Sequence, residues 1–244
     1  MILTKNLRHS LVYYDEFFPN RWLDAVGPNV RKYILGPGAP CDDATGDPTS
    51  WTVTVCEDGG GGDSTVVNAV TAGQMLLLTT DNADYDGVNM QLKGEAFKFA
   101  AHQPLYFGIK ATISSATQSD LLVGLCETLT ALINEDTSHA VAAANVEGVF
   151  FVCLDGATTV AAKTYKDGSQ TGTADSATAM DTAAHTYEIY WDGTTAYFYL
   201  DSVLVTSVAA DLPDGDLTPS ICFRTGDTAA ITMSVEEFRC IQVR

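Results

Sequence analysis

The sequence predicts an all-β protein made of antiparallel strands, and three observations support this prediction. Thr, Val and aromatic residues, which suit half-buried pleated strands, are frequent in the 244-residue chain. Apolar and polar residues alternate with a period of two in many short segments. Asp-Gly and Gly-rich turns separate these segments. Because hydrophobic residues make up 46% of the chain, we expect one well-packed sandwich or barrel.

Residues 1–50 differ from the rest of the chain because they are rich in aromatic residues, Pro and Gly. The run Gly36-Pro37-Gly38-Ala39-Pro40 breaks any regular element there. These residues contain too few apolar side chains for an independent domain. We interpret residues 1–50 as an extended N-terminal arm or first strand, and residues 51–244 as a single β-sandwich.

Strict alternation predicts strands at residues 51–55, 88–92 and 105–113. Weaker patterns predict further strands at 75–79, 96–100, 120–125, 148–154, 158–164, 186–191, 196–201, 203–208, 220–225, 230–235 and 238–243. Turns are expected at Asp58 with Gly59–Gly62, Asp86-Gly87, Asp155-Gly156, Asp167-Gly168, Asp192-Gly193 and Asp214-Gly215. The Ala-rich segment 126–146 allows a helical turn or two.

Two hairpins in tandem occupy residues 185–205 and carry the most information. Tyr187, Ile189 and Trp191 share one face of the first strand, and Asp192-Gly193 provides the turn that follows. Five side chains of these hairpins are expected to be buried: Tyr187, Ile189, Trp191, Phe198 and Leu200.

This run resembles the concanavalin A-like jelly roll of laminin-G-type modules, legume-lectin relatives and family 16 glycoside hydrolases. There the sequence reads roughly His-x-Tyr-x-Ile-x-Trp-Asp-Gly, although Ser202 stands here where a Gly is usual in the second turn. The resemblance covers residues 185–243 best and implies a jelly-roll β-sandwich. It implies a fold rather than a function, because this fold hosts enzymes, lectins and structural modules.

The spacing of the Asp and Glu residues indicates that the protein is not an enzyme. Retaining glycosidases need two carboxyl groups about 5 Å apart, and family 16 supplies them as Glu-x-Asp-x-Glu on one strand. That motif is absent, and the adjacent pairs Glu135-Asp136 and Glu236-Glu237 would face opposite sides of a strand. The four histidines, at 9, 102, 139 and 185, are scattered. We therefore expect no catalytic residues.

No cofactor or metal site is expected either. Residues 82–87, Asn-Ala-Asp-Tyr-Asp-Gly, begin like a calcium loop, but Lys93 would stand at the twelfth position, so the EF-hand interpretation fails. Carbohydrate binding would need exposed aromatic rings. The candidates are Tyr190, Tyr197 and Tyr199, although strand aromatics more often pack in a core.

The net charge of −18 argues against nucleic acid and anionic membranes as partners. No apolar run approaches the length of a membrane span, and no signal peptide is evident at the start. The six cysteines, at 41, 56, 126, 153, 222 and 240, include no Cys-x-x-Cys pair. They are expected to be reduced and buried, with a Cys41–Cys56 loop as the alternative.

Jelly rolls without catalytic carboxylates, signal peptide or lectin metal signature resemble decoration proteins of tailed bacteriophages. This resemblance implies a non-enzymatic capsid decoration or cement protein on the virion exterior, assembled in the host cytoplasm. It implies the major capsid protein as partner, a homo-oligomer with three-fold clustering, and a role for the arm in attachment. The alternative, from a different class, is a lectin-like carbohydrate-binding module that recognises a host-surface glycan.

The arm contains the predicted partner-binding residues. Residues 1–32 carry a net charge of +2, from five basic and three acidic residues, whereas the rest of the chain carries −20. Aromatic and Arg side chains often dominate interfaces. The candidates are Arg8, Tyr13, Tyr14, Phe17, Phe18, Arg21, Trp22, Arg31 and Lys32. The alternative is that the aromatic cluster is a strand that packs in the core of its own chain.

Overall fold

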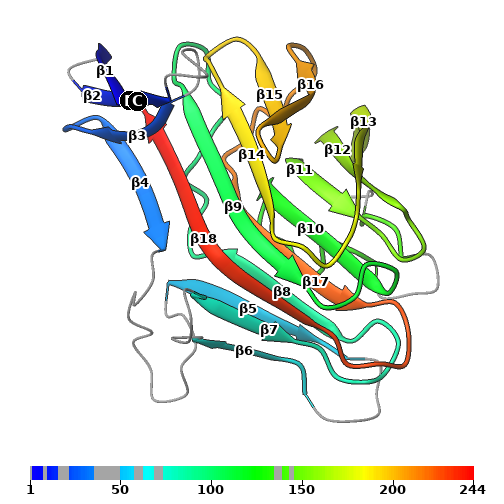
Figure 1. Ribbon diagram of the computed structural model, residues 1–244. Coiled ribbons are helices and arrows are strands. Elements are labelled where there is room, and N and C mark those ends of the chain that lie inside the picture. The colour runs from blue at the N-terminus through cyan, green and yellow to red at the C-terminus, as the bar shows by residue number, and fades with distance from the viewer. Residues whose placement is uncertain are drawn as a thin grey trace.

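The computed structural model describes residues 2–7, 10–15, 22–35, 50–57, 63–68, 74–134, 139–142 and 146–244. Across these residues the regular elements are all strands, arranged as two facing sheets and one small N-terminal sheet (Figure 1). None of the described elements is a helix of the length and apolarity that a membrane span requires. The predicted all-β sandwich is confirmed.

The first large sheet has seven strands in the order β13-β12-β11-β10-β17-β8-β5. These strands are β5 (Trp51–Cys56), β8 (Gly87–Leu92), β10 (Ser119–Cys126), β11 (Gly148–Cys153), β12 (Thr159–Lys166), β13 (Ser169–Ala179) and β17 (Thr218–Thr225). All neighbouring pairs are antiparallel. The strand order places β13 and β5 at the two edges.

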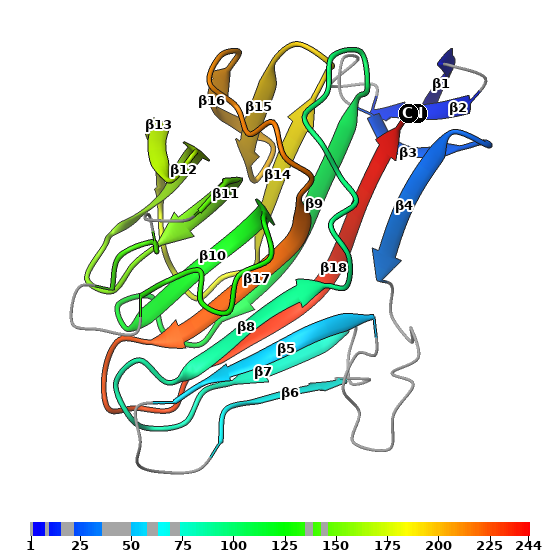
Figure 2. The same cartoon turned by 180° about the vertical axis from the view of Figure 1, so that it is seen from behind.

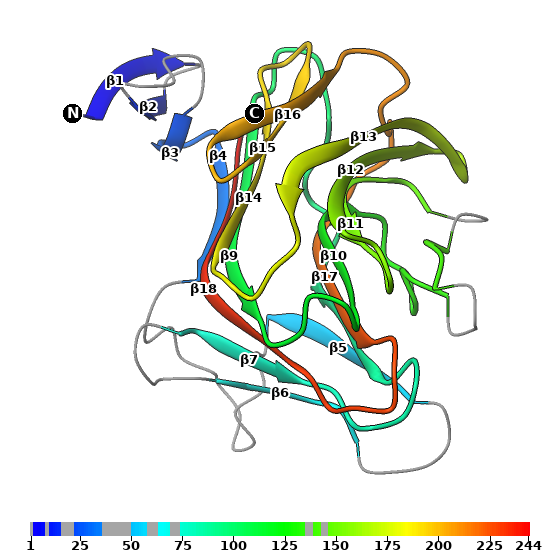
Figure 3. The same ribbon diagram turned by 45° about the vertical axis from the view of Figure 1, so that its right-hand side comes forward.

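The second large sheet follows the order β16-β15-β14-β9-β18-β7-β6, with β4 added beside β18. Its strands are β4 (Val30–Leu35), β6 (Thr65–Asn68), β7 (Leu76–Thr79), β9 (Leu105–Ile113), β14 (His185–Trp191), β15 (Ala196–Leu200), β16 (Val203–Val208) and β18 (Thr232–Val243). Figure 3 shows the sandwich from the side, with β9, β14 and β18 facing β10, β11 and β12.

Alternating side chains of both sheets fill the space between them. Leu121, Val123 and Leu125 of β10 belong to the same core cluster as the inward side chains of β14, and Phe151 of β11 packs edge-on against Phe198 of β15. Burying a large apolar side chain stabilises the fold by about 1.5–3 kcal/mol. The predicted burial of Tyr187, Ile189, Trp191, Phe198 and Leu200 is confirmed, because none of these side chains is more than 5% exposed.

Residues of the predicted arm form strands rather than an extended chain. β1 (Ile2–Leu7), β2 (Ser10–Asp15) and β3 (Trp22–Val26) make a three-stranded antiparallel sheet. Val12 and Ala25 are buried against Tyr106, Tyr190 and the end of β18. Figure 2 shows this small sheet beside the C-terminal end of β18, with β4 along the same strand. This part of the arm therefore packs on its own chain.

Three details of the predicted strand pattern are wrong. Residues 96–100 form no strand, since Phe97 makes only an isolated bridge with Leu217. The predicted strands 230–235 and 238–243 are one strand, β18, with a register shift between Val235 and Glu237. The described parts of 126–146 contain no helical turn and instead include a bridge between Ile133 and Val141.

The described cysteines lie in the packed interior. Cys126, Cys153, Cys222 and Cys240 are buried free thiols, and Cys56 is buried as well. Burial raises the pKa of Cys153 to about 11, and it also raises the pKa of Cys126, Cys222 and Cys240. Cys41 lies outside the described residues, and with it the alternative Cys41–Cys56 loop.

Candidate functional site

A segment between β10 and β11 covers much of the outer face of the seven-stranded sheet. We call its described residues, 127–134, 139–142 and 146–147, the strap. Four apolar side chains of the strap pack against outward-facing residues of β10, β11, β12 and β17. The strap contributes Leu132, Ile133, Val141 and Val146, and the sheet contributes Leu122, Cys126, Phe150, Val152, Tyr165 and Cys222.

Buried polar side chains of β8 form hydrogen bonds with the backbone of the strap. The Asn89 amide donates a hydrogen bond to the Leu129 carbonyl over 2.7 Å. The Gln91 amide donates to the Glu127 carbonyl over 2.9 Å, and its side-chain oxygen accepts a bond from the Leu129 N–H. These contacts exist because the outward positions of β8 carry amides where those of β10 and β11 carry apolar residues.

Arg224 ties the middle of the strap to the sheet. This side chain is fully buried on the outer face of β17. Its guanidinium donates to the carbonyls of Ile133 and Asn134 in the strap over 3.0 and 2.8 Å, and to the carbonyl of Tyr85 over 2.7 Å. Its bonded partners are therefore backbone carbonyls of two loops, which Arg224 joins.

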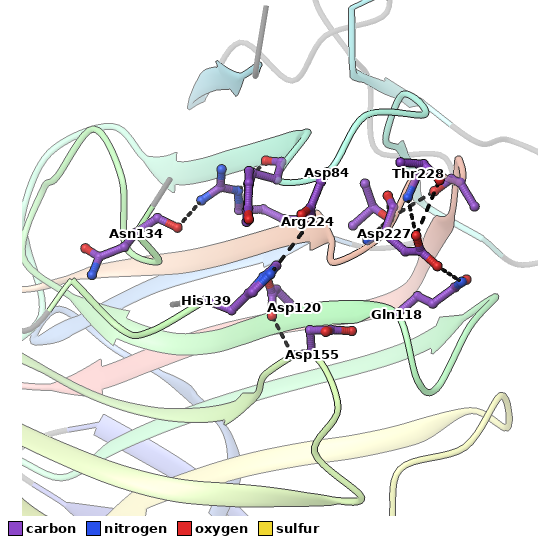
Figure 4. Close-up of polar contacts among 12 residues, drawn as sticks. Asp84, Gln118, Asp120, Asn134, His139, Asp155, Arg224, Asp227 and Thr228 are labelled. Carbon is purple, nitrogen blue, oxygen red and sulfur yellow. Dashed lines mark hydrogen bonds and ion pairs between the residues drawn. The ribbon is translucent and has the colours of Figure 1, made fainter. Parts of the chain in front are cut away.

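An Asp–His–Asp cluster lies beside Arg224 (Figure 4). Nδ1 of His139 is 2.7 Å from Oδ2 of the buried Asp120, and its Nε2 is 3.8 Å from Oδ1 of Asp84. The backbone N–H of Asp155 donates to the other Asp120 oxygen over 2.7 Å. The Tyr85 ring lies against His139, with centroids 4.8 Å apart.

The environment of Asp120 favours its protonated form. Burial raises the pKa of this carboxyl group, and the hydrogen bonds from His139 and Asp155 only partly oppose that effect. The cluster therefore places a carboxyl group with a raised pKa next to an imidazole and a second, more exposed carboxylate. Such a set can hold and transfer a proton.

A groove of about 470 Å³ runs along the outer face of the same sheet, over β12 and β13. It is lined by Val152, Cys153, Leu154, Gly156, Ala157, Thr158, Thr159, Ala161, Lys163, Gln170, Thr173 and Asp175. Lys163 pairs with Thr173 across the two strands, and Ala161 pairs with Asp175, so these residues share one face. The groove thus presents an ammonium, an amide, a hydroxyl and a carboxylate side by side.

The turn between β11 and β12 connects the groove to the cluster. Leu154 and Gly156 line the groove, and Asp155 between them binds Asp120 through its backbone N–H. The Asp155 backbone N–H therefore links this turn to Asp120, although Asp84, Asp120 and His139 do not line the groove. The polar side chains that line the groove can donate to and accept from several hydroxyl groups at once.

Sequence reasoning missed these groove residues because it did not predict β13. The turn at Asp167-Gly168 was predicted, but no strand was predicted between residues 164 and 186. The cluster was missed for another reason, since Asp84, Asp120, His139 and Asp155 come from four separate segments. The predicted turn character of residues 82–87 agrees with the structure, because Asp86 accepts a bond from the Ala83 N–H.

The predicted partner-binding residues are spread over several environments. Arg8, Phe17, Phe18 and Arg21 lie outside the described residues. Tyr14 of β2 pairs with Trp22 of β3 through the backbone, and Tyr13 is partly buried. Arg31 and Lys32 are exposed on β4, where Lys32 forms an ion pair with Asp24 over 3.2 Å. Partner binding by this set stays a prediction.

The aromatic residues considered for sugar stacking do not form an open platform. Tyr190 is 5% exposed, and its ring stacks on Tyr197 with centroids 6.3 Å apart. Both rings, with Tyr199, pack around the cluster that Val12 and Ala25 of the N-terminal sheet complete. The described residues contain no group of three or more His, Cys, Asp or Glu side chains arranged to hold a metal ion.

No family model matches this chain, and no curated protein matches it. Solved structures do match. The carbohydrate recognition domain of Emp46p is similar with a TM-score of 0.56 and 10% identity, over 85% of this chain and 95% of that one. A Bacillus licheniformis β-glucanase gives a TM-score of 0.58 and 12% identity, over 85% and 96%. The fold is a concanavalin A-like jelly roll.

A third neighbour, the Crh5 transglycosylase in complex with NAG, has a TM-score of 0.55 and 14% identity, over 87% of this chain and 83% of that one. The prediction that the chain is not an enzyme is contradicted by these neighbours, which include glucanases and transglycosylases. The absent Glu-x-Asp-x-Glu run excludes only carboxylates supplied by a single strand. It says nothing of carboxylates gathered from separate segments, as Asp84 of a loop and Asp120 of β10 are.

The predicted place on a virion has no counterpart in these findings. Neither the fold nor the neighbours named above point to a capsid, a phage or a three-fold assembly, so that role stays a prediction from the sequence.

Proposed function

We propose that this protein binds carbohydrate through the groove over β12 and β13. The observation that carries the proposal is the row of Lys163, Gln170, Thr173 and Asp175 along a groove of about 470 Å³. This volume lies within the range of small-molecule sites, roughly 300–1,000 Å³. The fold shared with a carbohydrate recognition domain and with glucanases supports the same choice.

The chemistry of the groove suits a hydroxyl-rich ligand. Gln170 offers amide donors, while its oxygen already accepts a bond from the Tyr165 hydroxyl over 3.3 Å. Thr173 can donate and accept through one hydroxyl, and Asp175 only accepts. All three are exposed on the edge strand β13, so a sugar displaces water from them without moving the backbone. The nearby aromatic ring of Tyr165 is buried against Phe150, so stacking contributes little. Binding is therefore expected to be weak for a single sugar unit.

The test is a glycan array followed by titration calorimetry on the best glycan. Asp175→Ala and Gln170→Ala should each weaken binding about tenfold or more, because each removes hydrogen bonds made to the ligand. Asp63→Ala, which removes an exposed carboxylate from the β5–β6 connection, serves as the matched control and should leave binding unchanged. Absence of binding to any glycan, or equal losses in all three variants, would contradict the proposal.

A second candidate function is cleavage or transfer of a glycosidic bond at the end of the groove. It is favoured by the Asp84–His139–Asp120 cluster, in which burial raises the pKa of Asp120 as a general acid requires. Incubation of the wild-type chain with β-glucans, with release of reducing ends as the readout, tests it. Activity that survives in His139→Gln would exclude the cluster as its source.

A further inference from the structure

A second groove, of about 400 Å³, lies at the other end of the sandwich. It is bounded by β4, the start of β5 and the connection from β8 to β9. Its lining residues are Arg31, Lys32, Tyr33, Ser50, Leu92, Lys93, Gly94, Ala96 and Phe97. Three of the nine are basic and none is acidic, in a chain that has only 13 Lys and Arg against 31 Asp and Glu.

Two guanidinium groups converge on one carbonyl at this groove. Nη1 of Arg31 donates to the Ala96 oxygen over 2.9 Å, and Nη2 of Arg244 donates to the same oxygen over 2.5 Å. Two like charges are thereby held within a few ångströms of each other, at an energetic cost. In the part of the chain that the structure describes, both guanidinium groups share this one neutral acceptor, which can take up only a few of their ten N–H donors.

The nearest carboxylates in the described part of the chain are directed elsewhere. Glu95, between two lining residues, accepts a hydrogen bond from the Thr128 N–H of the strap over 2.7 Å. Asp24 pairs with Lys32, 3.2 Å away. Within the described ranges, no carboxylate side chain therefore pairs with the guanidinium group of Arg31 or Arg244.

The floor of the groove is open at Gly94. This residue has φ of +87°, in the left-handed region, and a Cβ built there meets nothing within 4 Å. A ligand can approach the backbone at that point, with the basic side chains around it.

We propose that this groove binds the carboxylate or sulfate group of an acidic saccharide. Arg side chains hold such groups through paired hydrogen bonds in a fixed geometry. The negative group would also relieve the repulsion between Arg31 and Arg244. The saccharide part of this assignment rests on the proposed carbohydrate function, whereas the anion site rests on the groove alone.

The experiment measures binding of polygalacturonate, heparin and neutral dextran to the full chain by affinity electrophoresis and calorimetry. The wild type should bind at least one of the two acidic polymers, and dextran should not bind at this groove. Arg31→Gln and Arg244→Gln should each weaken that binding about tenfold. Lys166→Gln makes the same charge change at the far end of β12 and should have less than a twofold effect.

Each other outcome overturns the inference. Equal losses in Lys166→Gln would mean that only overall charge matters. Inorganic sulfate that binds as tightly as the polymers would mean that no saccharide is recognised. If neutral glycans bind at β12 and β13 while neither acidic polymer binds, this inference fails and the proposed function stands. Urea unfolding of each variant checks that folding is intact, as expected for an exposed side chain such as Arg31.

Discussion

Removal of the Arg224 guanidinium should destabilise the protein more than any other single change to a charged residue in the described sheets. Arg224→Met keeps most of the buried stem but leaves three backbone carbonyls without their donor. An orphaned buried carbonyl costs about 1–3 kcal/mol. The Ile133 bond is fully buried, whereas those to Tyr85 and Asn134 are only partly buried, so their cost lies at the low end. We expect a loss of about 3–5 kcal/mol.

Urea unfolding measures this loss directly. With a slope of about 3 kcal/mol/M, the midpoint should fall by about 1–2 M. In the variant, hydrogen exchange of the strap amides, which Arg224 holds, should become faster before exchange of the β9 or β14 amides does. Arg239→Met is the matched control, because Arg239 is a partly exposed side chain that pairs with Glu237 on the surface. The reasoning is refuted if Arg224→Met costs less than about 1 kcal/mol, or no more than Arg239→Met.

Three further predictions concern other parts of the molecule. Burial disfavours protonation of His185, but Asp201 at 2.7 Å and Asp181 at 3.1 Å outweigh it and raise its pKa above 6.5. The stability that this contact contributes is fully present below pH 6.5 and is lost as pH rises through the folded-state pKa. The urea midpoint of the wild type should therefore fall over that pH range, and the midpoint of His185→Gln should not show this fall. Gly193→Ala should lower the free energy of unfolding by about 1–3 kcal/mol, because φ is +101° and the new Cβ would lie 2.9 Å from the His102 backbone. An unchanged Tm in calorimetric melting would contradict this. Thiol titration of protein prepared without oxidants should give six thiols under denaturant and almost none of the buried ones in the native state; four or fewer under denaturant would reveal a disulfide.

Much of the sandwich could be predicted because its strands bury one face. The strand at 105–113 has the same bounds in the structure, and the tandem hairpins at 185–205 hold the side chains that the alternation placed inside. Alternation reports burial rather than pairing, which explains the error at 96–100. Phe97 and Phe99 are buried there as expected, but the backbone makes a single bridge.

The strand β13 could not be predicted because it lacks an apolar face. Ser169–Ala179 is an edge strand of small and polar residues that pairs only with β12, and most of its side chains are exposed. The groove depends on this strand. The Asp–His–Asp cluster also has no local signature, since its members come from a loop, the strap and strand β10 and meet only in the folded chain.

Backbone amide shifts in solution can map a bound glycan onto the surface, and we expect them to place it in the groove over β12 and β13. On titration with the best glycan from the array, the amides of Lys163, Gln170, Thr173 and Asp175 should shift together and saturate with one dissociation constant. The amide signals of β4 and of the 93–97 connection should not shift when a neutral glycan is added. Shifts confined to other surfaces, or saturation that persists unchanged in Asp175→Ala, would contradict the claim.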